Sequence, residues 1–107
     1  AAIDNFSKMK GDKKMIVLGD MFELGTESEK EHQNIVNLIG EKIPSSTVVL
    51  VGELFSKTKY KYNSIKFPDS KTAAEWMKSN LPENSLILMK GSRGMKMEVV
   101  ANVLMNN

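Results

Sequence analysis

The chain contains three short, mainly apolar runs, at residues 15–18, 47–51 and 85–89, the last two of which begin with Thr47 and Ser85. Runs of this length that do not alternate with polar residues are typical of parallel strands buried on both faces of a sheet. Residues 64–67 predict a further, brief strand, which Pro68 stops. The pattern therefore predicts four strands, of which the one at residues 64–67 is the third along the chain.

Between these strands, apolar residues recur at helical spacing. Ser28 and Glu31 have capping-box spacing at the start of the longest such segment, and Ser70 or Asp69 can cap another. The predicted helical segments are residues 1–9 (the end of a helix), 28 to about 42, a short piece from 54, 70 to about 80, and about 97 onward.

The alternation of strand and helix predicts an α/β fold, a three-layer α/β/α Rossmann-like sandwich on a mainly parallel sheet. Right-handed crossovers, together with the usual strand order of mononucleotide-binding folds, place the strands in the order 3-2-1-4 within this chain. The winding then reverses between the first and fourth strands, and sheets of this kind bind ligands beyond the carboxyl ends of the strands at that position. We therefore expect a ligand site at loops 19–25 and 90–95.

The composition narrows the possible partners. The 107 residues, 41% apolar and 26% charged, suit one folded domain. A formal charge of +2 is too small for a protein that binds mainly through phosphates of nucleic acid, so no nucleic-acid partner is expected. The lack of cysteine excludes disulfides and thiolate metal sites and is compatible with a cytoplasmic location. No apolar run approaches the ~20 residues of a spanning helix, so no membrane insertion is expected.

Residues 90–94 read Lys-Gly-Ser-Arg-Gly and lie between a predicted strand and a predicted helix. Glycines in such a turn let backbone N–H groups approach an anion, and Arg93 can grip a carboxylate or phosphate with two parallel hydrogen bonds. A glycine-rich turn with solvated basic side chains has the same pattern, and both interpretations stay open. Neither a Walker loop nor a dinucleotide-binding glycine motif occurs, so no standard nucleotide cradle is expected.

Loop 19–25 carries two carboxylates, Asp20 and Glu23. They could coordinate magnesium through water or accept a substrate hydrogen bond, whereas Asp20 could equally cap a turn. His32 is the only histidine and has no second histidine or cysteine to share a metal with, so a packed or surface role is favoured and no metal site is predicted. Residues 57–62 alternate lysines with other residues, including two tyrosines, and favour a solvated loop over a nucleic-acid stripe.

Three segments, taken in order, resemble the carboxyl-terminal domain of the Mur ligases. Residues 18–25 read Leu-Gly-Asp-Met-Phe-Glu-Leu-Gly, residues 29–32 read Glu-Lys-Glu-His, and residues 89–98 read Met-Lys-Gly-Ser-Arg-Gly-Met-Lys-Met-Glu. The first and last are specific to the family branch that adds D-alanyl-D-alanine to a peptidoglycan precursor. The resemblance in order and spacing covers nearly the whole chain.

The resemblance implies a role inside a larger ATP-dependent acid–D-amino-acid ligase of the cytoplasm. There, ATP phosphorylates the terminal carboxylate of UDP-N-acetylmuramoyl-tripeptide, and the amine of D-alanyl-D-alanine attacks the acyl phosphate to give an amide, ADP and phosphate. Residues 1–107 are expected to be an excised carboxyl-terminal domain, inactive alone and without catalytic residues of its own. ATP and Mg²⁺ are expected to bind mainly to the missing central domain, none of them tightly to this chain, and the UDP-binding amino-terminal domain is missing too.

The resemblance also implies roles for single residues. Arg93 is expected to hold the carboxylate of D-alanyl-D-alanine, helped by Lys90 and by the backbone amides of Gly91 and Ser92. Asp20 is expected to face the nucleotide. These residues lie on the two loops at which the strand order alone places a ligand.

Glu23 and His32 are secondary candidates for the same site. Two other functions remain open at this point: a free-standing, doubly wound module that binds a small ligand or acts as a receiver, and a protein-interaction domain without a ligand. A receiver needs a phosphorylatable aspartate after its third strand, where Asp69 follows a proline and is a poor candidate. An interaction domain would require an exposed apolar patch instead of loop 90–94.

Overall fold

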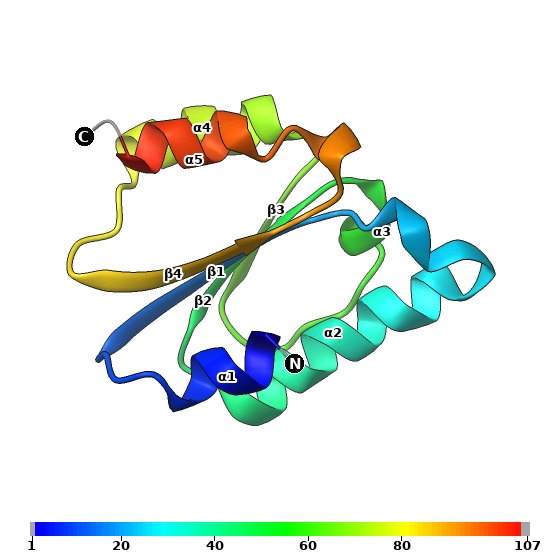
Figure 1. Ribbon diagram of the computed structural model, residues 1–107, viewed down its shortest axis with the longest axis horizontal. Coiled ribbons are helices and arrows are strands. Elements are labelled where there is room, and N and C mark those ends of the chain that lie inside the picture. The colour runs from blue at the N-terminus through cyan, green and yellow to red at the C-terminus, as the bar shows by residue number, and fades with distance from the viewer. Residues whose placement is uncertain (1, 106–107) are drawn as a thin grey trace.

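The computed structural model describes residues 2–105, and describes Glu23 and Leu24 only in their backbone (Figure 1). The elements, in chain order, are α1 (Ala2–Lys8), β1 (Lys13–Gly19), the 3₁₀ segment η1 (Phe22–Glu27), α2 (Ser28–Lys42), β2 (Thr47–Val51), α3 (Glu53–Ser56), β3 (Ser64–Phe67), α4 (Ser70–Ser79), β4 (Ser85–Lys90), the 3₁₀ segment η2 (Arg93–Met95) and α5 (Glu98–Met105). All four predicted strands and the helical segments between them are present.

The four strands form one parallel sheet in the order β3-β2-β1-β4, which confirms the predicted topology. Leu18 pairs with Leu50 of β2 on one side and with Lys90 of β4 on the other. All strands point the same way, so their carboxyl ends meet at one edge of the sheet.

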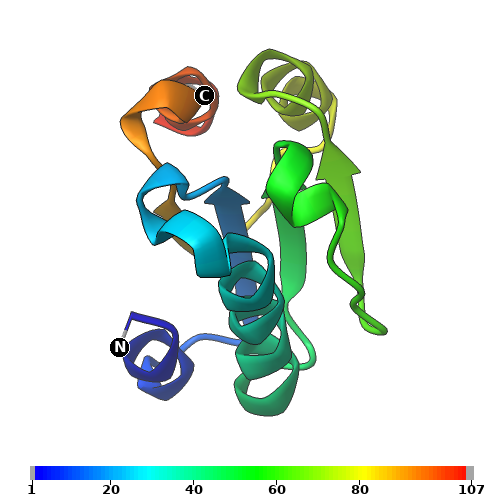
Figure 2. The ribbon, with the colours of Figure 1, turned by 90° about the vertical axis from the view of Figure 1, so that its right-hand side faces the viewer.

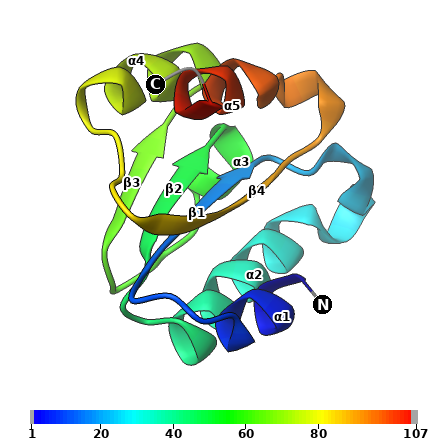
Figure 3. The same cartoon turned by 60° about the vertical axis from the view of Figure 1, so that its left-hand side comes forward.

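Helices cover both faces of the sheet, with α1, α2 and α3 on one side and α4 and α5 on the other (Figures 2 and 3). Successive residues of a strand point to opposite faces, so β1 sends Ile16 and Leu18 into the α1–α3 core and Met15 and Val17 into the α4–α5 core. This arrangement is the predicted α/β/α sandwich.

Two local predictions differ from the structure. Strand β4 was expected to be buried, but its side chains are partly exposed because it forms an edge of the sheet with β1 as its only neighbour. Ser28 was expected to cap α2 in a capping box, but it is the first helical residue and Glu27 precedes it without a side-chain cap. At α4, by contrast, the cap is Asp69, whose carboxylate accepts from Thr72 N–H.

The described helices of residues 2–105 include none that is long and apolar enough to cross a membrane.

Candidate ligand site at the carboxyl edge of the sheet

Loops 19–25 and 90–95 lie side by side at the end of β1 and β4 (Figure 1). The Ser92 N–H donates to the Asp20 carbonyl at 3.0 Å, and the Phe22 N–H donates to Ser92 Oγ at 2.8 Å. The two loops at which strand order places a ligand therefore form one hydrogen-bonded unit.

A hollow of about 650 Å³ opens at this edge of the sheet. The loops after all four strands line it, through Asp20, Phe22, Gly52, Glu53, Leu54, Pro68, Asp69, Ser70, Gly94, Met95 and Lys96. The strand order had predicted a ligand site only at the loops after β1 and β4. The signal for the other two was present, because the carboxyl ends of parallel strands always share one edge.

Asp20 is buried, and its carboxylate caps the short helix α3. Its Oδ2 accepts from Leu54 N–H and its Oδ1 from Phe55 N–H, both at 2.9 Å. This is the turn-capping alternative for Asp20, with the cap on the loop after β2. The same residue lines the hollow, so a bound ligand would meet an acid already held in place by two backbone donors.

Gly52 makes room for that cap. Its φ of +114° is open only to glycine in practice, and a Cβ built there would lie 2.3 Å from Asp20 Oδ2. The approach of the Asp20 carboxylate to α3 requires the positive φ at position 52 and the absence of a Cβ there. Gly52 and Asp20 together therefore stabilise the β2–α3 turn.

His32 is fully buried, as the packing alternative predicted. Its Nε2 accepts from Met21 N–H at 3.0 Å, its Nδ1 lies 2.6 Å from the Ser28 carbonyl, and its ring meets the ring of Phe55 edge-on at 4.5 Å. The histidine thus contacts the loop after β1 without lining the hollow.

The glycines of loop 90–94 are explained by close packing. A Cβ on Gly91 would lie 2.8 Å from Met97 Cγ and 3.1 Å from the Cα of Gly19, and one on Gly94 would lie 2.8 Å from the Phe22 ring. Ser92, whose amide was expected to help bind the substrate carboxylate, donates its N–H to the Asp20 carbonyl in this structure.

Among the described residues that line the hollow, Lys96 has the cationic side chain, and no sequence pattern singled it out. Lys96 takes a left-handed φ of +53°, directly after η2. Lys90 and Arg93 are exposed and are not among the lining residues. Both residues lie on the loop that borders the hollow, where their side chains are accessible to a ligand or to another protein surface.

Acids outnumber bases around the hollow, but they are spread out. Within the described part of the chain, no three histidine, cysteine or carboxylate side chains are grouped so that they could hold a metal ion. Asp69 is occupied by Thr72, whose hydrogen bonds hold the pKa of that carboxyl below its ordinary value of 3.8. The side chain of Glu23, the other predicted acid, lies outside the described residues.

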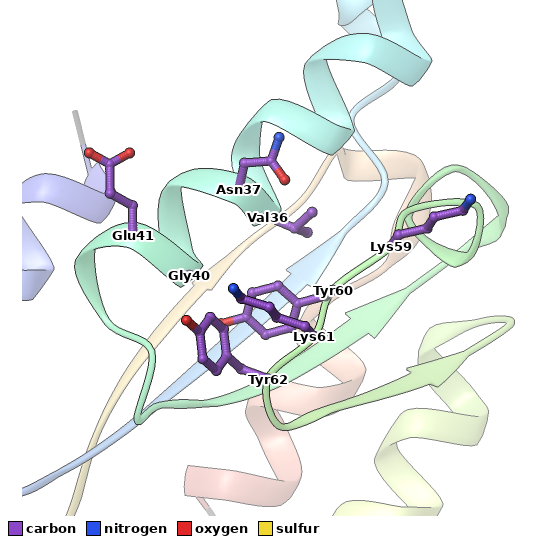
Figure 4. A pocket seen from close by; sticks show the side chains of 8 residues that line it. All are labelled: Val36, Asn37, Gly40, Glu41, Lys59, Tyr60, Lys61 and Tyr62. Atoms are coloured by element: carbon purple, nitrogen blue, oxygen red, sulfur yellow. The ribbon is translucent and has the colours of Figure 1, made fainter.

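A second groove, of about 570 Å³, lies along α2 and the segment before β3, and strand-end loops do not line it (Figure 4). The Tyr60 and Tyr62 rings meet at 5.7 Å beside Gly40, and burial raises the pKa of the Tyr60 hydroxyl. Gln33 exchanges two 2.9 Å hydrogen bonds with the Lys59 backbone. Residues 57–62 were expected to be a solvated loop, but their lysines are exposed while Tyr60 packs against the core.

A parallel α/β domain whose strand-end loops share one hollow belongs to the doubly wound class that positions ligands at the end of its sheet. Comparison with known proteins narrows this class. No protein-family model matches the chain. Curated relatives do match, and the chain is a homologue of the carboxyl-terminal domain of the Mur ligases.

The particular relatives are UDP-N-acetylmuramoyl-tripeptide--D-alanyl-D-alanine ligases. The chain is 32% identical to that of Bacillus subtilis over 100% of its own length, 34% to that of Rickettsia prowazekii over 95%, and 35% to that of Buchnera aphidicola over 97%. It spans only about a quarter of these relatives, 25%, 23% and 23% of their lengths.

Solved structures agree. The chain superposes with a TM-score of 0.76 on MurF from Acinetobacter baumannii, at 28% identity, covering 100% of this chain and 24% of that one. It also superposes with a TM-score of 0.76 on the MurF ligase of Thermotoga maritima in complex with ADP, at 22% identity, covering 98% of this chain and 24% of that one. At 22% identity, the similarity to the Thermotoga maritima structure establishes the fold alone.

Proposed function

We propose that this chain is the carboxyl-terminal domain of an ATP-dependent ligase that joins D-alanyl-D-alanine to UDP-N-acetylmuramoyl-tripeptide in peptidoglycan precursor synthesis. The observation that carries the proposal is the identity of 32–35% over 95–100% of the chain to three ligases of that name. The hydrogen-bonded pairing of the two motif-bearing loops supports it.

The rest of the enzyme lies outside these residues. The chain spans about a quarter of its relatives, which supports a place as one part of a larger enzyme. In this proposal residues 1–107 are one domain of three, and the enzyme works in the cytoplasm. The central domain binds ATP and Mg²⁺, the amino-terminal domain binds the UDP moiety, and ATP supplies the phosphoryl group that activates the tripeptide carboxylate. ADP in the related Thermotoga maritima structure supports the use of ATP.

Arg93 holds the carboxylate of D-alanyl-D-alanine in this proposal. It is the only arginine of the sequence, it is exposed, and a guanidinium can donate two parallel hydrogen bonds to a carboxylate. Lys90 and the Gly91 amide assist, while Ser92 holds the loop against Asp20. Since Arg93 borders the hollow without lining it, closure of the other domains over this edge completes the site.

Asp20 faces the nucleotide in the assembled enzyme. Its place in the lining of the hollow supports this role, and its two capping bonds keep the carboxylate in one orientation. A carboxylate oxygen has a second lone pair beyond the one that accepts a backbone N–H, so both oxygens retain the capacity to accept from a ligand.

The test is steady-state kinetics of the full-length ligase that carries this domain. Arg93→Ala should raise KM for D-alanyl-D-alanine at least about tenfold and leave KM for ATP within about twofold, because one charged, bidentate contact is lost. Arg93→Lys should recover only part of the loss, since an ammonium lacks the fork. Lys61→Ala, an exposed cation on the second groove, is the matched control. Unchanged dipeptide kinetics in Arg93→Ala would exclude this role for Arg93.

A further inference from the structure

The backbone of residues 20–22 is held at every N–H group. Asp20 N–H donates to the Val51 carbonyl at 3.0 Å, Met21 N–H to His32 Nε2 at 3.0 Å, and Phe22 N–H to Ser92 Oγ at 2.8 Å. These three bonds lead in turn to the end of β2, to α2 and to loop 90–94. The bond to Met21 N–H differs from the other two because its acceptor is the His32 side chain of α2.

The geometry fixes the state of the imidazole. A backbone N–H can only donate, so Nε2 must be the acceptor and the ring proton must be on Nδ1, which then donates to the Ser28 carbonyl at 2.6 Å. The edge-on contact with Phe55 holds the ring plane. His32 is fully buried, so bulk solvent does not reach either bond and losing one leaves a buried group unpaired.

Packing alone does not account for this arrangement. A leucine would fill similar apolar space, but it could not accept from Met21, which lies 11 residues earlier in the loop after β1. Met21 is directly bonded in sequence to both residues that contact Ser92, since Asp20 O accepts from Ser92 N and Phe22 N donates to Ser92 Oγ. Any displacement of Met21 must therefore move both contacts to loop 90–94.

We propose that His32 is a positioning residue for the ligand site. Its neutral imidazole acts through the Met21 amide to set the place of Ser92, and through Ser92 that of Arg93. His32 itself does not touch the ligand. The identity of that ligand, a small dipeptide with a free carboxylate, rests on the function proposed above, whereas the mechanical coupling does not.

NMR of the 107-residue chain tests the coupling directly. His32 is the only histidine, so its two ring nitrogens are assigned without ambiguity. The wild type should show a protonated, pyrrole-type Nδ1 and an unprotonated, pyridine-type Nε2; the opposite tautomer overturns the proposal. This measurement needs no variant and is unaffected if a substitution prevents folding.

Two substitutions separate positioning from packing. His32→Leu keeps bulk but has no acceptor, and His32→Gln places an amide oxygen where Nε2 lies. In His32→Leu, hydrogen exchange of the Met21 and Phe22 amides should accelerate about tenfold or more, and the Ser92 and Arg93 amide resonances should shift. His32→Gln should return both readouts most of the way to wild type. A folded His32→Leu chain whose changes stop at Met21, or equal effects of the two substitutions, overturns the proposal.

A titration of the full-length ligase that carries this domain with D-alanyl-D-alanine connects the coupling to the site, because closure of the other domains completes that site. The dipeptide should shift the Arg93 amide in the wild type, with affinity lowered about tenfold in His32→Leu and restored in His32→Gln. Binding unaltered in His32→Leu overturns the positioning role. Failure of the wild type to respond to the dipeptide counts against the proposed function, and the exchange and tautomer results then still decide the coupling.

Discussion

Gly52 and Asp20 show how much of the site depends on single residues. The carboxylate of Asp20 reaches the start of α3 only because position 52 carries no side chain and adopts a φ of +114°. Gly25 also has a positive φ, +65°, but a Cβ there would meet no atom within 4 Å. A side chain at Gly25 would therefore cause backbone strain alone, whereas one at Gly52 would cause strain and a collision with Asp20.

Gly52→Ala should lower the free energy of unfolding by about 3 kcal/mol, because strain adds to the loss of the Asp20 cap. Gly25→Ala should lower it by about 1 kcal/mol, through strain alone. Urea unfolding of the 107-residue chain, followed by circular dichroism, measures both. Equal losses in the two variants would contradict the collision with Asp20.

At the scale of elements, α4 depends on a cap that titrates. Asp69 accepts from the backbone N–H of Thr72 at 2.8 Å and from its hydroxyl at 2.7 Å. Hydrogen bonds from Thr72 lower the pKa of Asp69 below 3.8, so the folded chain favours the charged carboxylate. A carboxyl with a lowered folded pKa stabilises the fold above its unfolded pKa, and this contribution is lost as pH falls through the folded pKa.

Asp69→Ala should therefore reduce stability at neutral pH, and the difference from wild type should shrink as pH falls below 3.8. Asp69→Asn keeps a capping oxygen without the charge, so its stability at neutral pH should lie between that of the wild type and that of Asp69→Ala. Thermal unfolding across this pH range gives the result, with Asp12→Ala, in an exposed turn, as the control. A difference that persists unchanged at low pH would argue against a titrating cap.

On the scale of the whole molecule, two cores share one sheet. Ile39 of α2 and Met77 of α4 are fully buried in the α1–α3 core and the α4–α5 core, respectively. Neighbouring residues of β1 and β2 contribute side chains to both cores. Neither helical layer can therefore keep its packing if the sheet unfolds.

Ile39→Ala and Met77→Ala should each lower the free energy of unfolding by about 2–5 kcal/mol. The effects should add within about 0.5 kcal/mol in the double variant, because the side chains lie on opposite sides of the sheet. Unfolding should remain a single transition by circular dichroism and tryptophan fluorescence. Separate transitions for the two probes would mean that the layers are independent units.

Periodicity along the chain was enough to predict the elements and their order. Strands buried on two faces leave continuous apolar runs, and right-handed crossovers leave few topologies for four of them. Edge exposure of β4 was not recognised from its apolar run, although the predicted order already placed it at an edge. The capping box at Ser28 was wrong because spacing alone does not set the dihedral angles of a helix start.

The sequence by itself was enough to predict the α/β class, the 3-2-1-4 order and the two loops that meet at the carboxyl edge. Local periodicity gives the class, and chain handedness with the usual order of mononucleotide-binding folds gives the strand order and the loops. Only the tertiary structure decided which groups are already engaged: Ser92 N–H by Asp20, and Met21 N–H by His32. It also placed Lys96, and not Arg93, in the lining of the hollow. The partner of each hydrogen-bond donor and the direction of each side chain depend on the dihedral angles of the loops and on contacts between distant segments. No local sequence pattern encodes these.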